Sequence, residues 1–255
     1  MGDGGTAREA GGATVKTQIV VDTLNRLDLL RCTLEGIWAN TTTPYRLHVI
    51  DDASEEGNAE YLRKKRAEGK IDSVTLREKR LGIPANWNEA ARTGDSEIVV
   101  YTNGDVLCPK IPQPDWLARG LGAMSRYPEL GLLSLNSPMC TANGGWKVIE
   151  RWDGVTVCDR VPSFFLFARR ALMQEIVIPD VGGRLAGIPI VASFAKIDRA
   201  WSVAARARGY KVGYLTKVYC RHIGLHSVRN GRDLSRWDVE PLDAETLVPP
   251  EEWRG

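Results

Sequence analysis

Short apolar runs alternate with longer amphipathic or charged stretches over the first 107 residues. Runs rich in Val, Ile and Leu predict strands at 17–21, 46–50, 74–76 and 98–101. The stretches between them predict helices at 27–38, 55–68 and 84–92. This strand and helix order predicts an α/β fold, with a mainly parallel central sheet and helices on both faces.

The pattern becomes less regular after residue 107. It predicts a helix from Pro114 to Tyr127, strands at 130–135, 163–168 and 212–215, loops or a hairpin at 143–152, a Gly- and Pro-rich segment at 176–193, and a helix at 196–208. We expect this part to complete the sheet and to form the second wall of a cleft. One domain is therefore expected over residues 14–225, in halves 14–107 and 108–225, with a flexible tail at 1–13 and a C-terminal extension at 226–255.

Charge and cysteine content narrow the class of protein. The 34 basic and 32 acidic residues leave a net charge of +2, which is not that of a general nucleic-acid-binding protein. Residues 206–236 are locally basic, which favours a solvated surface or a wall facing phosphates. The five cysteines lack Cys-x-x-Cys spacing, which favours reduced thiols in a cytoplasm over a zinc site. No run approaches the roughly 18–20 apolar residues of a membrane span, so we expect a soluble protein.

Two of the predicted strands end in acidic residues. Asp51 and Asp52 follow the strand at 46–50, and Asp105 follows the strand at 98–101. Because ligands bind at the carboxyl ends of the strands in open α/β sheets, these carboxylates are candidates for a nucleotide and metal site. Asp105 could instead cap a turn, and Asp52 or Ser54 could instead cap the following helix.

The turn after the first strand, residues 22–26, contains no glycine. A dinucleotide fingerprint or a P-loop would need glycine there, so a bound diphosphate has to be held by another device. A divalent cation on Asp105, assisted by basic residues, is the economical candidate. The acids Asp51 and Asp52 would then contact the base or the ribose.

Several segments, taken in order, resemble motifs of inverting glycosyltransferases with the GT-A fold, in the large family-2-like group. They are Val20–Arg26 (V-V-x-T-x-N-R), Val49–Ser54 (V-x-D-D-x-S), Leu81–Asn88 (the G-x-x-x-x-x-N loop and helix), Thr102–Val106 (N-x-D-V, the rhamnosyltransferase-like form of D-x-D), Phe164–Arg170 (an apolar strand plus R-R) and Ile197–His222 (E-D, then R-x-x-G-Y, then H). The resemblance implies a Rossmann-like nucleotide-binding half and an acceptor-binding half. No single segment is specific, but their order is.

The resemblance implies transfer of a sugar from a UDP-, GDP- or dTDP-sugar to an acceptor hydroxyl, with inversion. Asp198 would be the general base, because a hydroxyl is too weak an acid to attack unaided. Asp198 lies beside an apolar helix face, near the helix start, where the dipole favours an ionised base. Mn²⁺ or Mg²⁺ would bind Asp105, and His222 could contact the metal or the diphosphate or be a strand-end histidine. The implied donor-binding residues are Thr23, Asn25, Arg26, Asp51, Asp52, Gly82, Asn86, Asn103, Gly104 and Asp105.

Three positions depart from the family pattern. Asn103 replaces the first acid of D-x-D, Ile197 replaces the acid before the base, and Asp22 stands where the family often has proline. A nucleotidyltransferase and a sugar-nucleotide-binding protein without activity therefore remain alternatives. The acceptor could be a polyanion, such as modified DNA or a phosphate-bearing carrier, or a small molecule or glycan. Three tryptophans could stack on a ligand or pack in the core, namely Trp146, Trp152 and Trp201.

Overall fold

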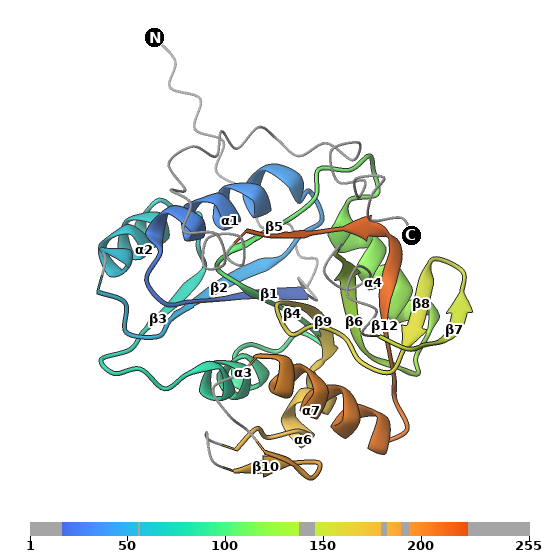
Figure 1. The fold of residues 1–255 in the computed structure, drawn as a ribbon. Helices are drawn as coiled ribbons and strands as arrows, with labels where there is room; N and C mark the ends of the chain where they lie inside the picture. Colours follow the sequence, from blue (N-terminus) through green and yellow to red (C-terminus); the bar gives the residue numbers. More distant parts are fainter. Residues whose placement is uncertain (1–16, 56, 138–145, 180–182, 190–193, 224–255) are drawn as a thin grey trace.

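The computed structural model describes residues 17–55, 57–137, 146–179, 183–189 and 194–223. The expected tail at 1–13 and extension at 226–255 lie outside these ranges. Within them, the main sheet has nine strands in the order β3-β2-β1-β4-β9-β6-β12-β8-β7 (Figure 1). Its strands are β1 (Thr17–Thr23), β2 (Arg46–Asp51), β3 (Ser73–Leu76), β4 (Ile98–Asn103), β6 (Leu130–Asn136), β7 (Val148–Trp152), β8 (Val155–Cys158), β9 (Phe165–Arg169) and β12 (Lys211–Tyr219).

The sheet is parallel in its first half and mixed in its second. Strands β3, β2, β1 and β4 are all parallel, as the alternation of strands and helices predicts. Strand β9 runs antiparallel to both β4 and β6, and β12 pairs parallel with β6 and antiparallel with β8. Strands β7 and β8 form an antiparallel hairpin. Residues 148–152, within the stretch expected to form loops or a hairpin, are its first strand, and its second strand lies beyond that stretch; residues 143–145 lie outside the described ranges.

Helices cover both faces of the sheet, as expected (Figure 1). On one face lie α1 (Leu27–Asn40), α2 (Asn58–Ala67) and α4 (Trp116–Arg126), and on the other lie α3 (Ile83–Arg92), α6 (Arg170–Glu175) and α7 (Phe194–Ala207). Successive strand residues point to opposite faces, so Ile19 and Val21 face the first group of helices and Val20 faces the second. Strands β1, β4 and β6 are buried on both faces, which explains their almost continuous apolar sequence.

Several boundaries differ from the sequence prediction. Helix α2 begins at Asn58 instead of residue 55, because Gly57 adopts a left-handed conformation (φ 72°) immediately before it. Pattern reasoning also missed α6, which is too short for helical periodicity to show. It missed the two-residue strands β5 (Val106–Leu107) and β13 (Arg221–His222), and β10 (Arg184–Leu185) and β11 (Ile188–Pro189) within the Gly- and Pro-rich segment.

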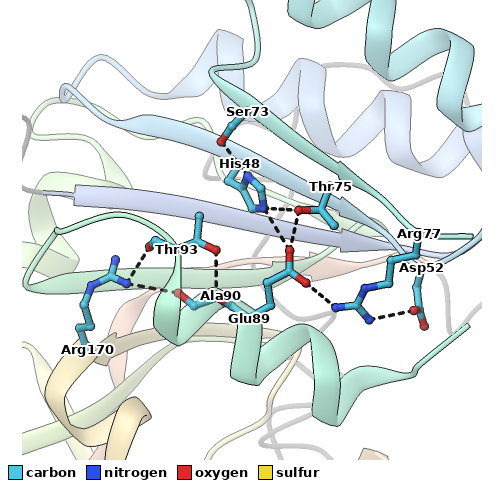
Figure 2. A network of polar contacts seen from close by, with 9 residues as sticks. All are labelled: His48, Asp52, Ser73, Thr75, Arg77, Glu89, Ala90, Thr93 and Arg170. Atoms are coloured by element: carbon cyan, nitrogen blue, oxygen red, sulfur yellow. Dashed lines mark hydrogen bonds and ion pairs between the residues drawn. The ribbon is translucent and has the colours of Figure 1, made fainter.

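The paired arginines at the end of strand β9 connect it to neighbouring helices and loops. Arg169 donates to the carbonyls of Leu130 and Met124. Arg170 is buried and donates to the carbonyls of Ala90 and Thr93, at the end of α3 (Figure 2). It also donates to the carbonyl of Ala91. Because these bonds satisfy carbonyls left over at helix ends and loops, this pair is structural in the protein.

Candidate active site

A cavity of about 610 Å³ opens at the carboxyl ends of β1, β2 and β4. The start of α3 and Ile197 of α7 complete its described wall. Most of the residues predicted to bind the donor line this cavity. They are Thr23, Asn25, Arg26, Asp52, Gly82, Asn86, Asn103, Gly104 and Asp105. The edge of the sheet therefore forms a concave site where α/β folds place their ligands.

Asp105 lies in the turn between β4 and β5 and faces two basic side chains. Arg26 Nη1 is 3.2 Å from Asp105 Oδ2, and His222 Nε2 is 3.6 Å from Asp105 Oδ1. His222 reaches this position because β13 pairs antiparallel with β5, with His222 opposite Val106. The structure therefore brings together Asp105 and His222, which are 117 positions apart in the sequence.

The surroundings of Asp105 fit a divalent cation that has few protein ligands. Asp105 Oδ1 is buried and accepts no hydrogen bond from any described residue. The described residues contain no group of three or more His, Cys, Asp or Glu side chains able to hold a metal. Among the described His, Cys, Asp and Glu side chains, a cation here would therefore have at most Asp105 and His222 as ligands. Mg²⁺ commonly binds through one or two carboxylates and takes its remaining ligands from water and phosphate.

The turn after β1 is held in an unusual conformation. Asn25 and Arg26 both have φ of 57°, in the left-handed region that non-glycine residues rarely adopt. The turn is fixed by the β2–α2 loop, since Ser54 Oγ accepts the N–H of Asn25 at 2.7 Å and Asn25 Oδ1 accepts the N–H of Glu55 at 2.8 Å. This arrangement aims the Arg26 side chain at Asp105. Such backbone strain typically accompanies a functional site.

The neighbouring acids Asp51 and Asp52 have different surroundings. The Asp51 carboxylate binds the hydroxyl and N–H of Ser54, and burial raises its pKa. Asp52 lines the cavity, where its carboxylate accepts the N–H groups of Leu81 (2.8 Å) and Gly82 (2.7 Å). Asp52 thus shapes the cavity wall by holding the loop before α3. The alternative that Asp52 or Ser54 caps α2 is wrong, because Gly57 occupies the capping position.

A polar network behind the cavity was not apparent in the sequence (Figure 2). Arg77 bridges Asp52 (3.1 Å) and Glu89 (2.6 Å). The nearby His48 ring, whose Nε2 is 3.9 Å from Glu89 Oε1, and hydrogen bonds from Thr75 and Arg77 lower the pKa of Glu89 to about 2. The network connects the end of β2, the loop after β3 and helix α3. It fixes the position of the wall that Asp52 supports.

Asp198 lies in the first half of α7, next to the cavity residue Ile197. Its Oδ1 accepts the N–H of Ser163 at 2.8 Å, and burial raises its pKa to about 6. The raised pKa makes Asp198 a stronger base than an ordinary carboxylate while leaving it largely ionised at neutral pH.

Trp201, on the same helix, is buried and packs against Trp87 with ring centroids 3.5 Å apart. For Trp201, core packing is therefore the correct alternative.

The basic stretch does not line the cavity over its described part, which ends at residue 223. Arg208 pairs with Glu175 at 3.3 Å, and Lys211 pairs with Glu150 at 2.6 Å. The cations in the described cavity lining are Arg26 and Arg80, and the latter was missed by sequence reasoning.

Asp22 was also missed as a site residue. It lines the cavity, and burial raises its pKa to about 7.

This sheet, with its cavity at the strand ends, is the GT-A fold of glycosyltransferases. The sequence model of glycosyl transferase family 2 matches residues 18–175, which is more than half of the chain. The protein therefore belongs to glycosyl transferase family 2. No curated protein matches the chain. No described helix is long and apolar enough to cross a membrane.

Solved structures share the fold at low sequence identity. The mannosyltransferase PcManGT from Pyrobaculum calidifontis, in complex with GDP-Man and Mn²⁺, is 21% identical with a TM-score of 0.58, over 80% of this chain and 56% of its own. S. aureus TarS in complex with UDP-GlcNAc is 17% identical with a TM-score of 0.55, over 82% and 61%. GalNAc-T7 with UDP, GalNAc and Mn²⁺ is 13% identical with a TM-score of 0.62, over 82% and 44%. The chain thus spans between 44% and 61% of the length of these proteins.

Proposed function

We propose that this protein transfers a sugar from a nucleotide-diphosphate sugar to an acceptor hydroxyl, with inversion at the anomeric carbon. The observation that carries the proposal is the strand-edge cavity of a family 2 chain, in which Asp105 Oδ1 is buried without a hydrogen-bond donor. Similar structures that contain GDP-Man, or UDP-GlcNAc, support a nucleotide sugar as the donor.

The donor diphosphate would lie over Asp105, close to the two cavity arginines. Arg26 and Arg80 supply positive charge that favours binding of the diphosphate. Asp105 and His222 would hold Mn²⁺ or Mg²⁺, which stabilises the charge that develops on the departing nucleotide. Mn²⁺ in two similar structures supports the metal. Arg26 contacts Asp105 Oδ2, so Oδ1, on the His222 side, is the oxygen that suits the cation.

Asp198 would take the proton of the acceptor hydroxyl as the new bond forms. Its pKa of about 6 keeps it mostly ionised at pH 7, while the hydrogen bond from Ser163 fixes its orientation. A single carboxylate acting as base fits one direct displacement, and one displacement inverts the anomeric carbon. The adjacent Ile197 supplies an apolar wall where an acid is usual in this family.

The acceptor hydroxyl belongs either to a polyanion or to a small molecule or glycan. The basic run at 206–236 motivated a polyanion, either modified DNA or a phosphate-bearing carrier. Its described cations lie outside the cavity lining, and two of them pair with acids of the same fold, so a small molecule or glycan is an equal candidate. Acceptor binding that does not change between low and high salt would exclude the polyanion.

One assay separates this function from the alternatives. The protein is incubated with UDP-, GDP- and dTDP-sugars and Mn²⁺, and release of the nucleoside diphosphate is followed. We expect Asp105→Ala to abolish metal-dependent release and Asp198→Asn to slow release by at least about a hundredfold. Asp95→Ala is the control, because this acid is exposed and outside the cavity lining. Release of pyrophosphate would indicate a nucleotidyltransferase, and binding without turnover would indicate a protein that has lost activity.

A further inference from the structure

Asp22 places a buried carboxyl in the floor of the cavity. It is the second-last residue of β1, and it pairs in register with Asn103 of β4 and Ile50 of β2. Like Val20 two residues earlier, its side chain points to the face covered by α3, where Asn86 Nδ2 donates to Asp22 Oδ2 at 3.3 Å. Asp22 is only 8% exposed, and both residues line the cavity.

Two oxygens of this pair have no hydrogen-bond donor among the described residues. They are Asp22 Oδ1 and Asn86 Oδ1, and both are buried. The hydroxyl of Tyr101 is close enough to lower the pKa of Asp22 but does not reach hydrogen-bond geometry. Even a hydrogen bond from Tyr101 would leave Asn86 Oδ1 without a donor. Buried acceptors are rarely left unpaired in native proteins, so the pair calls for a ligand that brings two O–H or N–H groups.

The position of Asp22 and Asn86 within the cavity indicates which part of the donor brings these two O–H or N–H groups. The cavity extends from Asp105, where the diphosphate would lie, to Ile197, which is adjacent to the proposed base. Asp22 is next to Asn103 in the sheet, on the Asp105 side, and Asn86 is on the helix whose first residues face the cavity together with Ile197. In a nucleotide sugar bound this way, the group that lies between the diphosphate and the proposed general base, Asp198, is the sugar that is transferred.

We infer that Asp22 and Asn86 form a subsite that accepts hydrogen bonds from two hydroxyls of the transferred sugar. A carboxyl oxygen and an amide oxygen side by side match two neighbouring O–H donors of a pyranose. The apolar residues Ile83, Pro84 and Ile197 around the pair offer a surface for the C–H groups of the sugar. This inference rests on the proposed function and adds the residues that recognise the sugar.

Calorimetry on the full chain with Mn²⁺ can separate sugar recognition from nucleotide recognition. UDP-glucose, UDP-GlcNAc, GDP-mannose and dTDP-rhamnose are each titrated beside the matching nucleoside diphosphate. Asp22→Asn keeps the side-chain shape but replaces one acceptor oxygen with an N–H donor. For the donor that binds most tightly, we expect this variant to weaken binding of the nucleotide sugar about tenfold or more and to change binding of the diphosphate less than twofold.

Two further variants make the result decisive. Asn86→Ala should give the same split between sugar and diphosphate, and it removes the second acceptor without a change of charge. Asp72→Asn makes the same chemical change outside the cavity, where Asp72 accepts the N–H of Leu47, and should alter neither affinity. Retained binding of the diphosphate shows that each variant is folded.

The outcomes distinguish this inference from the proposed function. Equal losses for the diphosphate and the nucleotide sugar would overturn the inference, because the pair would then contact the base or the ribose. Unchanged affinity for both ligands in Asp22→Asn and Asn86→Ala would also overturn it. If the wild-type protein binds no nucleotide in the panel, the proposed function fails, and the subsite fails with it.

Discussion

Replacing Arg77 with methionine should destabilise the protein by about 3–5 kcal/mol, because it removes the cation that bridges the buried Asp52 and the partly buried Glu89. The Arg77 side chain is 8% exposed and bridges Asp52, which is 3% exposed, and Glu89, which is 26% exposed. Methionine fills a similar volume, so the main loss is electrostatic. Asp52 keeps its two backbone donors, Leu81 and Gly82, but loses its only charged partner among the described residues.

A matched ion pair on the surface separates the effect of burial from the effect of distance. Arg126 Nη1 lies 2.6 Å from Asp153 Oδ2, the same separation as Arg77 Nη2 from Glu89 Oε2. The side chains of the surface pair are 60% and 86% exposed, so water and salt screen the interaction. We expect Arg126→Met to cost less than about 1 kcal/mol.

Urea denaturation of both variants at pH 7 measures the difference in the free energy of unfolding, and thermal denaturation measures the corresponding change in melting temperature. For a chain of this size, 1 kcal/mol corresponds to about 2–4 °C in the melting temperature, so Arg77→Met should lower it by about 6–20 °C. The pKa of Glu89 is depressed, so its contribution to stability is present above its ordinary pKa of 4.5 and is lost as the pH falls towards 2. The loss of stability between pH 4.5 and pH 2 should be smaller in Arg77→Met than in the wild-type protein. Equal destabilisation by Arg77→Met and Arg126→Met would refute the reasoning.

Three further predictions concern other parts of the protein. Turnover should fall about tenfold per pH unit below the Asp198 pKa of about 6, and a rate that is flat down to pH 5 would exclude Asp198 as the base. Burial raises the pKa of Asp22 in the folded protein to about 7. The stability that its carboxyl group contributes is therefore complete below its ordinary pKa of 3.8 and is lost as the pH rises through 7. In urea denaturation of the donor-free protein, Asp22→Asn should accordingly be more stabilising at pH 8 than at pH 4. Gly120→Ala places a Cβ in steric conflict with the Phe167 ring and should cost about 1–3 kcal/mol. Gly122→Ala, with open space around it in the same helix, should gain up to about 1 kcal/mol. Equal effects of the two variants in urea denaturation would contradict the packing of α4.

The strands that form the cavity were predictable because their apolar runs stop at polar residues. Residues 98–101 are apolar and aromatic, and the change to Thr102 and Asn103 marks the edge of the sheet where Asp105 lies. The contact between Asp105 and His222 could be anticipated only through the family resemblance. It depends on β5 and β13, and strands of two residues are too short to show periodicity.

Adjacent residues with different roles were harder to predict. The sequence treats Asp51 and Asp52 as one acidic pair, yet the strand alternation of Val49 and Ile50 continues through them. Asp51 therefore points towards the face of α1 and α2, and Asp52 points towards the face of α3. The Arg77 network was also hidden, because its members come from separate elements and no local pattern connects them.

The loss of an acid at Asn103 has a counterpart on the neighbouring strand. Asp22 stands directly beside Asn103 in the β1–β4 ladder, so this level of the sheet edge still carries one carboxyl group. It does not simply restore a second metal ligand, because its oxygens lie in the buried floor with Asn86 and burial raises its pKa to about 7, whereas metal-binding carboxylates are ionised. Nearby Asp105 and Asp52 raise that pKa further, which would disfavour another full negative charge. A carboxyl group in this state would suit the recognition of neutral hydroxyls, and under the proposed function Asp105 would be the carboxylate that holds the cation.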